Sequence, residues 1–290
     1  SAATVGASSV FSATGGNITL GALESAINNL YTVTISGANT YTQNGNVGAT
    51  NALSSFIVTA NSMVLGSNLR ANSSIVLNAP LTLTATSQVT SLSSGVQFSN
   101  AINGAFGLTV NAGDQINFNA NVGQTTPLAS LTATATNGII INFGTTIFAT
   151  SGAQAYNSAF AFNDAVAFST SNSPITFAST FNSLVGIARN PSFTTGSGNI
   201  TFTGNVGGVQ PVGFTSIIST GTTTVTGTFV GASLSTSGGT LVLNNNLTLS
   251  NALQVSGASS ALRLNNNILV TLTGSAIATF ANTVDSFNST

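Results

Sequence analysis

The chain has 290 residues, only 2% of them charged, and a net charge of −1 at pH 7. So little charge excludes the electrostatic attraction that binding to nucleic acid or anionic lipid requires. The absence of cysteine and histidine excludes disulfides, thiolate metal sites and the usual general base of a serine nucleophile, while a hydrophobic content of 42% is enough to build a core.

The N-terminal part of the chain predicts an arm followed by a cap. Residues 1–20 are rich in Ser, Ala and Gly, and we expect them to form an arm that reaches a neighbouring subunit. Residues 21–35 are expected to form a short capping helix, because Leu23, Ile27 and Leu30 follow helical spacing and Glu24 lies near the helix start. Such a cap would keep the first edge strand from pairing with another chain.

From residue 36 to 274 the dominant pattern is the alternation of apolar and polar residues, which is typical of strands with one buried face. Clear examples are residues 81–85, 116–122, 200–206 and 262–267. Gly, Asn, Ser and Pro interrupt these runs about every ten residues. No apolar run approaches the roughly 18 residues of a membrane helix, so we expect no membrane insertion.

The sequence Asn-Val-Gly occurs three times, around Val47, Val122 and Val206, and each copy is followed by small or Pro residues and then an apolar one. A finer repeat lies near the C-terminus, where residues 241–249 recur as 262–270 with an offset of 21. Four units of about 20 residues would fill each interval between the Asn-Val-Gly copies, and such a period is typical of solenoids.

The finer repeat predicts a ladder of asparagine side chains, because residues one period apart lie above each other in a solenoid and stacked amides can bond. The ladder pairs Asn244, Asn245 and Asn246 with Asn265, Asn266 and Asn267, and the same offset places Leu247 on Ile268. We therefore predict an all-β fold, a right-handed parallel β-helix of about 20 residues per coil. A β-sandwich is the alternative, since it also uses alternating strands.

Residues 275–290 are expected to form a C-terminal cap or tail. Ile277, Phe280, Val284 and Phe287 have helical spacing, although the threonine content also permits strands.

Candidate catalytic groups are few, and we expect no enzyme, cofactor or metal. Asp114 and Asp164 are the best-placed pair for glycoside hydrolysis, but each also fits a turn, after Gly113 and Asn163 respectively. The Asn-x-Ser/Thr sequons at Asn17, Asn72, Asn199, Asn246 and Asn288 are expected from composition alone. The phenylalanines are expected to stack internally rather than to form a sugar platform; they include Phe118, Phe143, Phe160, Phe162, Phe168 and Phe177.

Three stretches, GNITFTGNVGG (198–208), NVGQTTPLASLTATA (121–135) and SGAQAYNSAFAF (151–162), resemble repeats of secreted bacterial β-helix proteins. These include filamentous-haemagglutinin-like proteins and autotransporter passenger domains, among them rickettsial surface antigens. The resemblance covers residues 40–273. It implies a parallel β-helix, a location outside the cell or on the surface of a bacterium, and a role in adhesion or coat formation.

Three functional hypotheses remain open at this point. The first is a structural subunit of an extracellular filament, sheath or surface layer, whose partners are copies of itself joined through the solenoid ends or an exchanged terminal strand. The second is an adhesin passenger that binds a glycan or protein on a host or neighbouring cell. The third is a functional amyloid, in which the repeats stack between chains.

Overall fold

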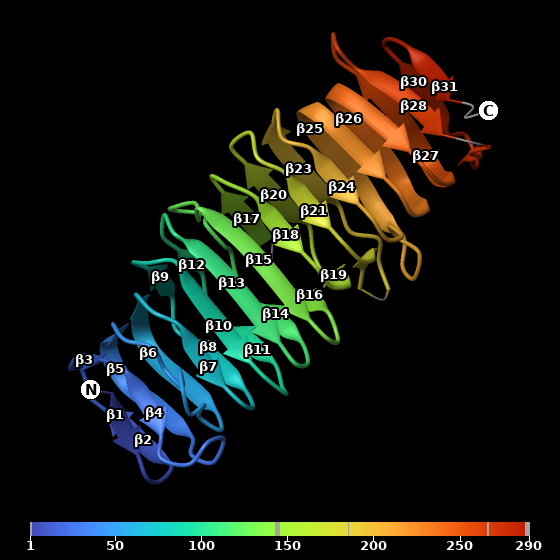
Figure 1. Cartoon of the computed structure of the whole chain (residues 1–290). Coiled ribbons are helices and arrows are strands. Elements are labelled where there is room, and N and C mark those ends of the chain that lie inside the picture. Colours follow the sequence, from blue (N-terminus) through green and yellow to red (C-terminus); the bar gives the residue numbers. More distant parts are fainter. Residues whose placement is uncertain (1, 143–145, 185, 266, 288–290) are drawn as a thin grey trace. The chain divides into compact units, whose positions relative to one another are not determined.

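A computed structural model describes residues 2–142, 146–184, 186–265 and 267–287. These residues form a parallel β-solenoid of about 13 turns and contain no helix (Figure 1). The predicted fold class is confirmed, and the β-sandwich alternative is wrong because each strand pairs in parallel with a strand of the next coil. The chain divides into two compact units, residues 1–140 and 141–290.

In the first unit the stacked coils form three parallel sheets. The first sheet contains β1 (Ala3–Val5), β4 (Leu23–Ser25), β7 (Leu69–Ala71), β10 (Ser87–Ser91), β13 (Gly107–Ala112) and β15 (Ser130–Ala135), with Val47 bridging β4 to β7. The second contains β2 (Ser9–Ser12), the first parts of β5 (Val33–Gln43) and β6 (Phe56–Leu65), β8 (Ile75–Asn78), β11 (Val96–Phe98) and β14 (Ile116–Phe118). The third contains β3 (Ile18–Leu20), the second parts of β5 and β6, β9 (Leu81–Leu83) and β12 (Ile102–Asn103). Strand β16 (Ile139–Ile141) lies where the sequence passes from one unit to the next.

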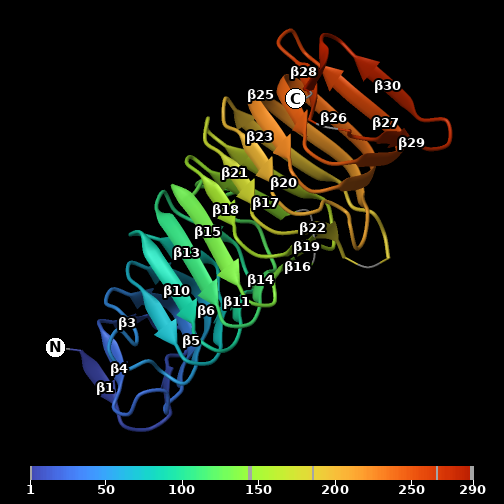
Figure 2. The same ribbon diagram turned by 45° about the vertical axis from the view of Figure 1, so that its right-hand side comes forward.

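The second unit also has three parallel sheets, as Figure 2 shows from another side. Its first sheet contains β17 (Thr146–Thr150), β20 (Val166–Thr170), β23 (Pro191–Gly196), parts of β25 (Val212–Val225), β26 (Phe229–Leu243) and β27 (Leu247–Ser256), and β30 (Ile277–Phe280). Its second contains β18 (Gln154–Tyr156), β21 (Ile175–Phe177), β24 (Ile200–Phe202), the ends of β25 and β26, β28 (Ala261–Asn265) and β31 (Val284–Phe287). Its third contains β19 (Phe160–Phe162), β22 (Phe181–Ser183), the starts of β26 and β27, and β29 (Val270–Leu272).

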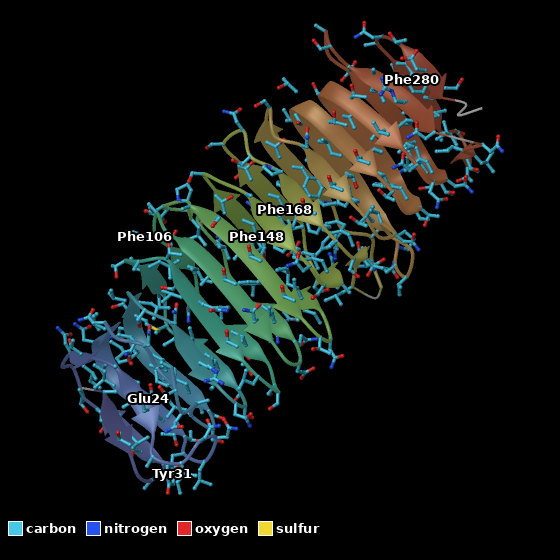
Figure 3. All side chains as sticks on the ribbon, in the orientation of Figure 1. Glu24, Tyr31, Phe106, Phe148, Phe168 and Phe280 are labelled. Carbon is cyan, nitrogen blue, oxygen red and sulfur yellow. The ribbon has the colours of Figure 1, made fainter. Side chains whose placement is uncertain are left out.

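The core of the second unit is built from three columns of stacked aromatic rings, one from each sheet. Their members are Phe148, Phe168 and Phe193; Tyr156, Phe177 and Phe202; and Phe160 and Phe181. Neighbouring rings within a column are 4.9–5.5 Å apart, which is close to the strand spacing. Figure 3 labels Phe148 and Phe168 in the first column. The predicted internal stacking is confirmed for five of the six phenylalanines, and Phe143 lies outside the described residues.

The predicted arm and N-terminal cap are wrong. Residues 3–20 form a complete coil, because β1, β2 and β3 each pair in register with the second coil. Residues 23–25, expected in a helix, are strand β4, whose Leu23 and Ser25 are buried while Ile27 and Leu30 are exposed. The apolar spacing therefore reflects strand and turn positions, and the parallel partner strand outweighs the local helical pattern.

The C-terminal segment continues the solenoid instead of forming a helical cap. Strand β30 pairs with β27, and β31 pairs with β28. The strands that the threonines permitted are present at residues 277–280 and 284–287, and residues 288–290 lie outside the description.

The Asn-Val-Gly motif forms the same hydrogen-bonded clamp in all three places. The Asn carbonyl accepts from the backbone N–H of one apolar residue in the preceding coil, and the Gly N–H donates to the carbonyl of that same residue. The residues held in this way are Leu23, Ile102 and Phe181, and each forms a single-residue parallel bridge with the buried motif valine. The motif is thus a strand of one residue that ends at once.

The motif glycine ends the strand because it adopts a left-handed conformation, with φ of 65°, 73° and 68° at Gly48, Gly123 and Gly207. A Cβ atom at Gly207 would lie 1.9 Å from the carbonyl oxygen of Val230. The chain then leaves the coil as a bulge and returns. Conformation and close approach both require glycine here.

The bulge after each clamp is fixed by the side chain that follows the clamped residue. The Glu24 carboxylate accepts from the backbone N–H of Asn51 at 2.8 Å, Asn103 Oδ1 accepts from that of Thr125 at 3.0 Å, and Asn182 Oδ1 from that of Val209 at 3.1 Å. Glu24 therefore caps a loop of the next coil and not a helix.

The Asn-Val-Gly copies do not mark a constant number of coils. Within the first unit, Val47 bridges strands of the first sheet, whereas Val122 bridges Ile102 of the third. The prediction that four whole units separate these two copies is wrong, because the clamp can form at any corner that offers an apolar residue to hold.

Replacing Gly207 by Ala is expected to destabilise the fold far more than replacing Gly274. Both glycines have φ of +68°, but the nearest atom to a Cβ at Gly274 is 3.9 Å away. Gly274→Ala should cost only the left-handed strain of about 1 kcal/mol, and Gly207→Ala roughly 1–3 kcal/mol more for the clash. Urea unfolding followed by circular dichroism measures both. Equal losses would show that the clamp accommodates a side chain.

Candidate assembly interface

The first coil leaves one edge of each of its three strands without a neighbour among the described residues. Ala3 donates to Ala22 O and Val5 accepts from Ala26 N, so both point to the second coil. The N–H and C=O groups of Thr4, which lies between them, point away from the second coil, because the bonding direction alternates from residue to residue along a parallel strand. By the same alternation Val10 and Thr19 present free N–H and C=O groups on β2 and β3.

The inward side chains of β2 and β3 in the first coil are only half-buried, although Val5 of β1 is 7% exposed. Phe11 and Ile18 are of intermediate exposure, whereas Ile35 and Tyr41, their partners in the second coil, are 0% exposed. The second coil is covered on both sides, and the first on only one. No other described residue covers its apolar face in the stacking direction.

The last described coil is likewise uncovered by any other described residue. Phe280 and Val284 are 38% and 48% exposed, while Val255 and Leu262, on which they lie, are 2% exposed. Figure 3 labels Phe280 on this coil. Ala281 donates to Val255 O, so that Phe280 and Ala278 point their backbone groups to the open side.

The free backbone groups of the two end coils match each other in the way that those of neighbouring coils inside the solenoid do. Inside the first unit, inward residues bond to the following coil, as Leu20 O does with Asn44 N and Gln43 O with Gly66 N. On the last coil, the backbone N–H and C=O groups of inward residues such as Phe280 point away from the preceding coil. On the first coil, it is the backbone groups of outward residues such as Val10 that point away from the second coil. The last coil of one copy can therefore accept the first coil of another with inward residues on inward residues.

Electrostatic repulsion at these edges is small. Residues 2–20 contain no charged side chain. On the last coil the single acid, Asp285, lies in register beside Arg263 of the preceding coil, so neighbouring rungs carry opposite charges. Opposite charges on adjacent strands are favourable, and like charges are not.

The predicted asparagine ladder is present at one rung. Asn265 Nδ2 donates to Asn244 Oδ1 at 2.7 Å, and Leu241 and Leu243 pair with Leu262 and Leu264 at the predicted offset of 21. Beyond this rung the register changes, since Leu247 pairs with Val270 and not with Ile268. The prediction for Leu247 is wrong because the corner of the later coil contains two more residues.

The remaining asparagines of the ladder bind backbone groups or lie apart. Asn246 Oδ1 accepts from the backbone N–H of Leu269 at 2.9 Å, and Asn245 Oδ1 accepts from that of Asn246. Asn267 is exposed with φ of 44°, a left-handed turn position that asparagine tolerates. Asn266 lies outside the described residues.

Asparagine has a wider structural role than the predicted ladder. At many corners its Oδ1 accepts a backbone N–H of the following coil, which satisfies a donor that the strand pairing leaves free. The residues that do so are Asn17, Asn28, Asn46, Asn68, Asn103, Asn172, Asn182, Asn190, Asn199, Asn205 and Asn246. Three sequons, at Asn17, Asn199 and Asn246, fall in this set, and Asn288 lies outside the described residues.

Asn246→Asp should preserve stability, while Asn265→Asp should lower it. A carboxylate at position 246 still accepts from Leu269, but at position 265 it loses the Nδ2 donor and faces the Asn244 oxygen. The expected difference is about 1 kcal/mol, measured by thermal or urea unfolding. A ladder of stacked amides through Asn246 and Asn267 would instead make both variants unstable.

The two aspartates considered for glycoside hydrolysis bind turn groups. Asp114 Oδ1 accepts from Asn137 Nδ2, and Asp164 Oδ1 accepts from the backbone N–H of Ala165, both at 2.7 Å. Asp114 belongs to the first unit and Asp164 to the second. Over the described ranges no three acidic or other metal-ligating side chains gather in one place, and no helix is long and apolar enough to cross a membrane.

Two buried tyrosines sit beside buried glutamines in similar arrangements. The Tyr156 hydroxyl donates to Gln154 Oε1 at 3.0 Å, and that of Tyr41 donates to Gln43. Burial raises the pKa of both phenols above their usual range. The fold therefore holds these tyrosines in the neutral form.

Stability should fall as the pH rises above about 10, where unfolded tyrosines ionise. A pKa raised by folding contributes stability that is fully present below the unfolded pKa and is lost as the pH rises through the folded one. The chain has no lysine or cysteine to obscure this effect. Tyr156→Phe should flatten the alkaline decrease of the urea midpoint. An unchanged slope in Tyr156→Phe would contradict the assignment.

Comparisons with protein-family models, with curated proteins and with solved structures found no match.

Proposed function

We propose that this chain is a non-enzymatic structural subunit that assembles end to end with copies of itself. The observation that carries the proposal is the pair of end coils, in each of which strand edges have no partner among the described residues and inward apolar side chains such as Phe11 and Phe280 are partly exposed. A second copy is the occupant that fits best, because the two edges match in hydrogen-bond phase and in the side chains that would meet. The joint would repeat the contact made between neighbouring coils.

The physical driving force would be the same as inside the solenoid. Residues such as Phe11, Phe280 and Val284 would lose their remaining exposure, and burial of apolar surface contributes about 25 cal/mol per Å². Strand addition at an open edge is a general route to association. With almost no charge on either coil, little repulsion opposes the joint.

A filament, sheath or surface layer outside a bacterial cell is the setting we propose for such a subunit, on the basis of the repeat resemblance. The adhesin hypothesis concerns the outer faces of the solenoid and is compatible with assembly. The amyloid hypothesis receives less support, because the repeats already stack within one chain over the described residues.

Lysines on the open edge of the first coil should abolish assembly. Val10→Lys/Thr19→Lys places two cations beside the free strand edges, where lysine opposes pairing with another chain. We expect the unmodified chain to sediment as oligomers that lengthen with concentration and to form filaments under the electron microscope. The double variant should remain monomeric.

The matched control is Thr82→Lys/Thr109→Lys, which adds the same charge on outward positions of β9 and β13, both covered by coils on either side. This variant should assemble as the unmodified chain does. A chain that stays monomeric at all concentrations, or two lysine variants that behave alike, would contradict end-to-end assembly.

A further inference from the structure

A hollow of about 220 Å³ lies on the outer face of the first sheet of the first unit. Buried Val47 and Leu69 form its floor, and polar or small side chains surround them. The surrounding residues are Asn46, Ala49, Asn68, Arg70, Gln88 and Thr90. No residue here takes part in the proposed joint.

The two asparagines of this hollow are oriented as donors. Asn46 Oδ1 accepts from the backbone N–H of Asn68 at 3.0 Å, and Asn68 Oδ1 accepts from that of Gln88 at 2.8 Å. Because each amide oxygen is held by the protein, each Nδ2 group is left to donate elsewhere. The hollow therefore offers two amide donors to a ligand that accepts hydrogen bonds.

Arg70 supplies the positive charge. Its Nη1 donates to the carbonyl oxygens of Gly48 and Ala49, at 3.2 and 3.4 Å, which orients the guanidinium at the hollow. The carboxylate of Glu24 accepts hydrogen bonds from the backbone N–H groups of Thr50 and Asn51 and, within the described part of the chain, forms no hydrogen bond with Arg70. An arginine held by carbonyls keeps its remaining N–H groups for a carboxylate or another planar anion.

A second hollow of about 340 Å³ adjoins the first at Thr90 and crosses β10, β13 and β15. Three of its side chains lie in the same row as Arg70, because the strand register pairs Arg70 with Thr90, Thr90 with Asn111, and Asn111 with Thr134. Exposed Leu92 and Thr136 line the hollow beside this row. A chain that followed this row would meet one polar side chain in each coil, about every 4.8 Å.

We infer that this row binds an acidic polysaccharide. A carboxylate of the sugar chain binds Arg70 and the Nδ2 groups of Asn46 and Asn68, and sugar hydroxyls bind Thr90, Asn111 and Thr134. An extended polyhydroxylated chain suits the row better than an acidic peptide does, because the side chains beyond Arg70 are uncharged groups that can bond with hydroxyls.

The test is calorimetric titration of the whole chain with an oligogalacturonate long enough to span the row. Arg70→Gln should weaken binding at least about tenfold, since a charge-assisted bond is replaced by a neutral one. Arg189→Gln is the matched control, because it removes the same charge from a coil of the second unit that takes no part in the proposed joint, and its affinity should equal that of the unmodified chain. Unfolding curves of both variants establish that they are folded.

Three outcomes would overturn the inference. They are an equal loss in both arginine variants, equal affinity for a neutral galactan oligosaccharide of the same length, and tighter binding of poly-glutamate than of oligogalacturonate. The inference concerns the first unit alone, so loss of assembly in the edge variants leaves it unaffected, and an absence of binding leaves the assembly proposal unaffected.

Discussion

The backbone hydrogen bonds between one coil and the next are the interaction on which the rest of this structure depends. They are parallel and hold their register along most of each strand, so each residue has a fixed partner above and below it. In the second unit this register places ring on ring at about the strand spacing, from Tyr156 to Phe177 to Phe202. The shared spacing lets the same displacement satisfy the backbone and the core together.

The register also accounts for the scarcity of charge. A charged residue repeated from coil to coil would place like charges about 4.8 Å apart, which is destabilising on neighbouring strands. Amide and hydroxyl side chains avoid this repulsion and can still satisfy backbone donors at the corners. Where two charges do occupy adjacent rungs, at Arg263 and Asp285, they have opposite signs.

The sequence predicted the fold class, the inward position of the aromatic residues and the pairing of Leu241 with Leu262, because strict alternation and a repeat of fixed length are local signals. It did not predict the fate of residues 3–25, where helical spacing and strand-plus-turn spacing coincide for Leu23, Ile27 and Leu30. Only the partner coil decides between them. The sequence did not predict the register change after Asn246 for a related reason. The register there depends on the conformation of the next corner and not on the residues that the two repeats share.

The same limit applies to the candidate sites. Asn244 and Asn265 could be paired from their offset, whereas the clamp around Leu23 joins residues that share no local pattern with it. The partial exposure of the two end coils could not be predicted from the sequence, because their apolar residues follow the same alternation as those of any other coil. The row that begins at Arg70 likewise required the register of four strands, since its members have no common motif.

The Asn-Val-Gly clamp separates the length of a loop from the alignment of the core. The chain leaves the coil only after its one-residue strand is fixed by two bonds to the same partner residue, and a side chain of the preceding coil then holds the excursion. Residues added beyond the glycine would extend into solvent without shifting any rung. The three bulges are therefore natural insertion points, where a repeat protein of this kind can acquire new surface during evolution, or receive a grafted peptide, while its scaffold stays unchanged.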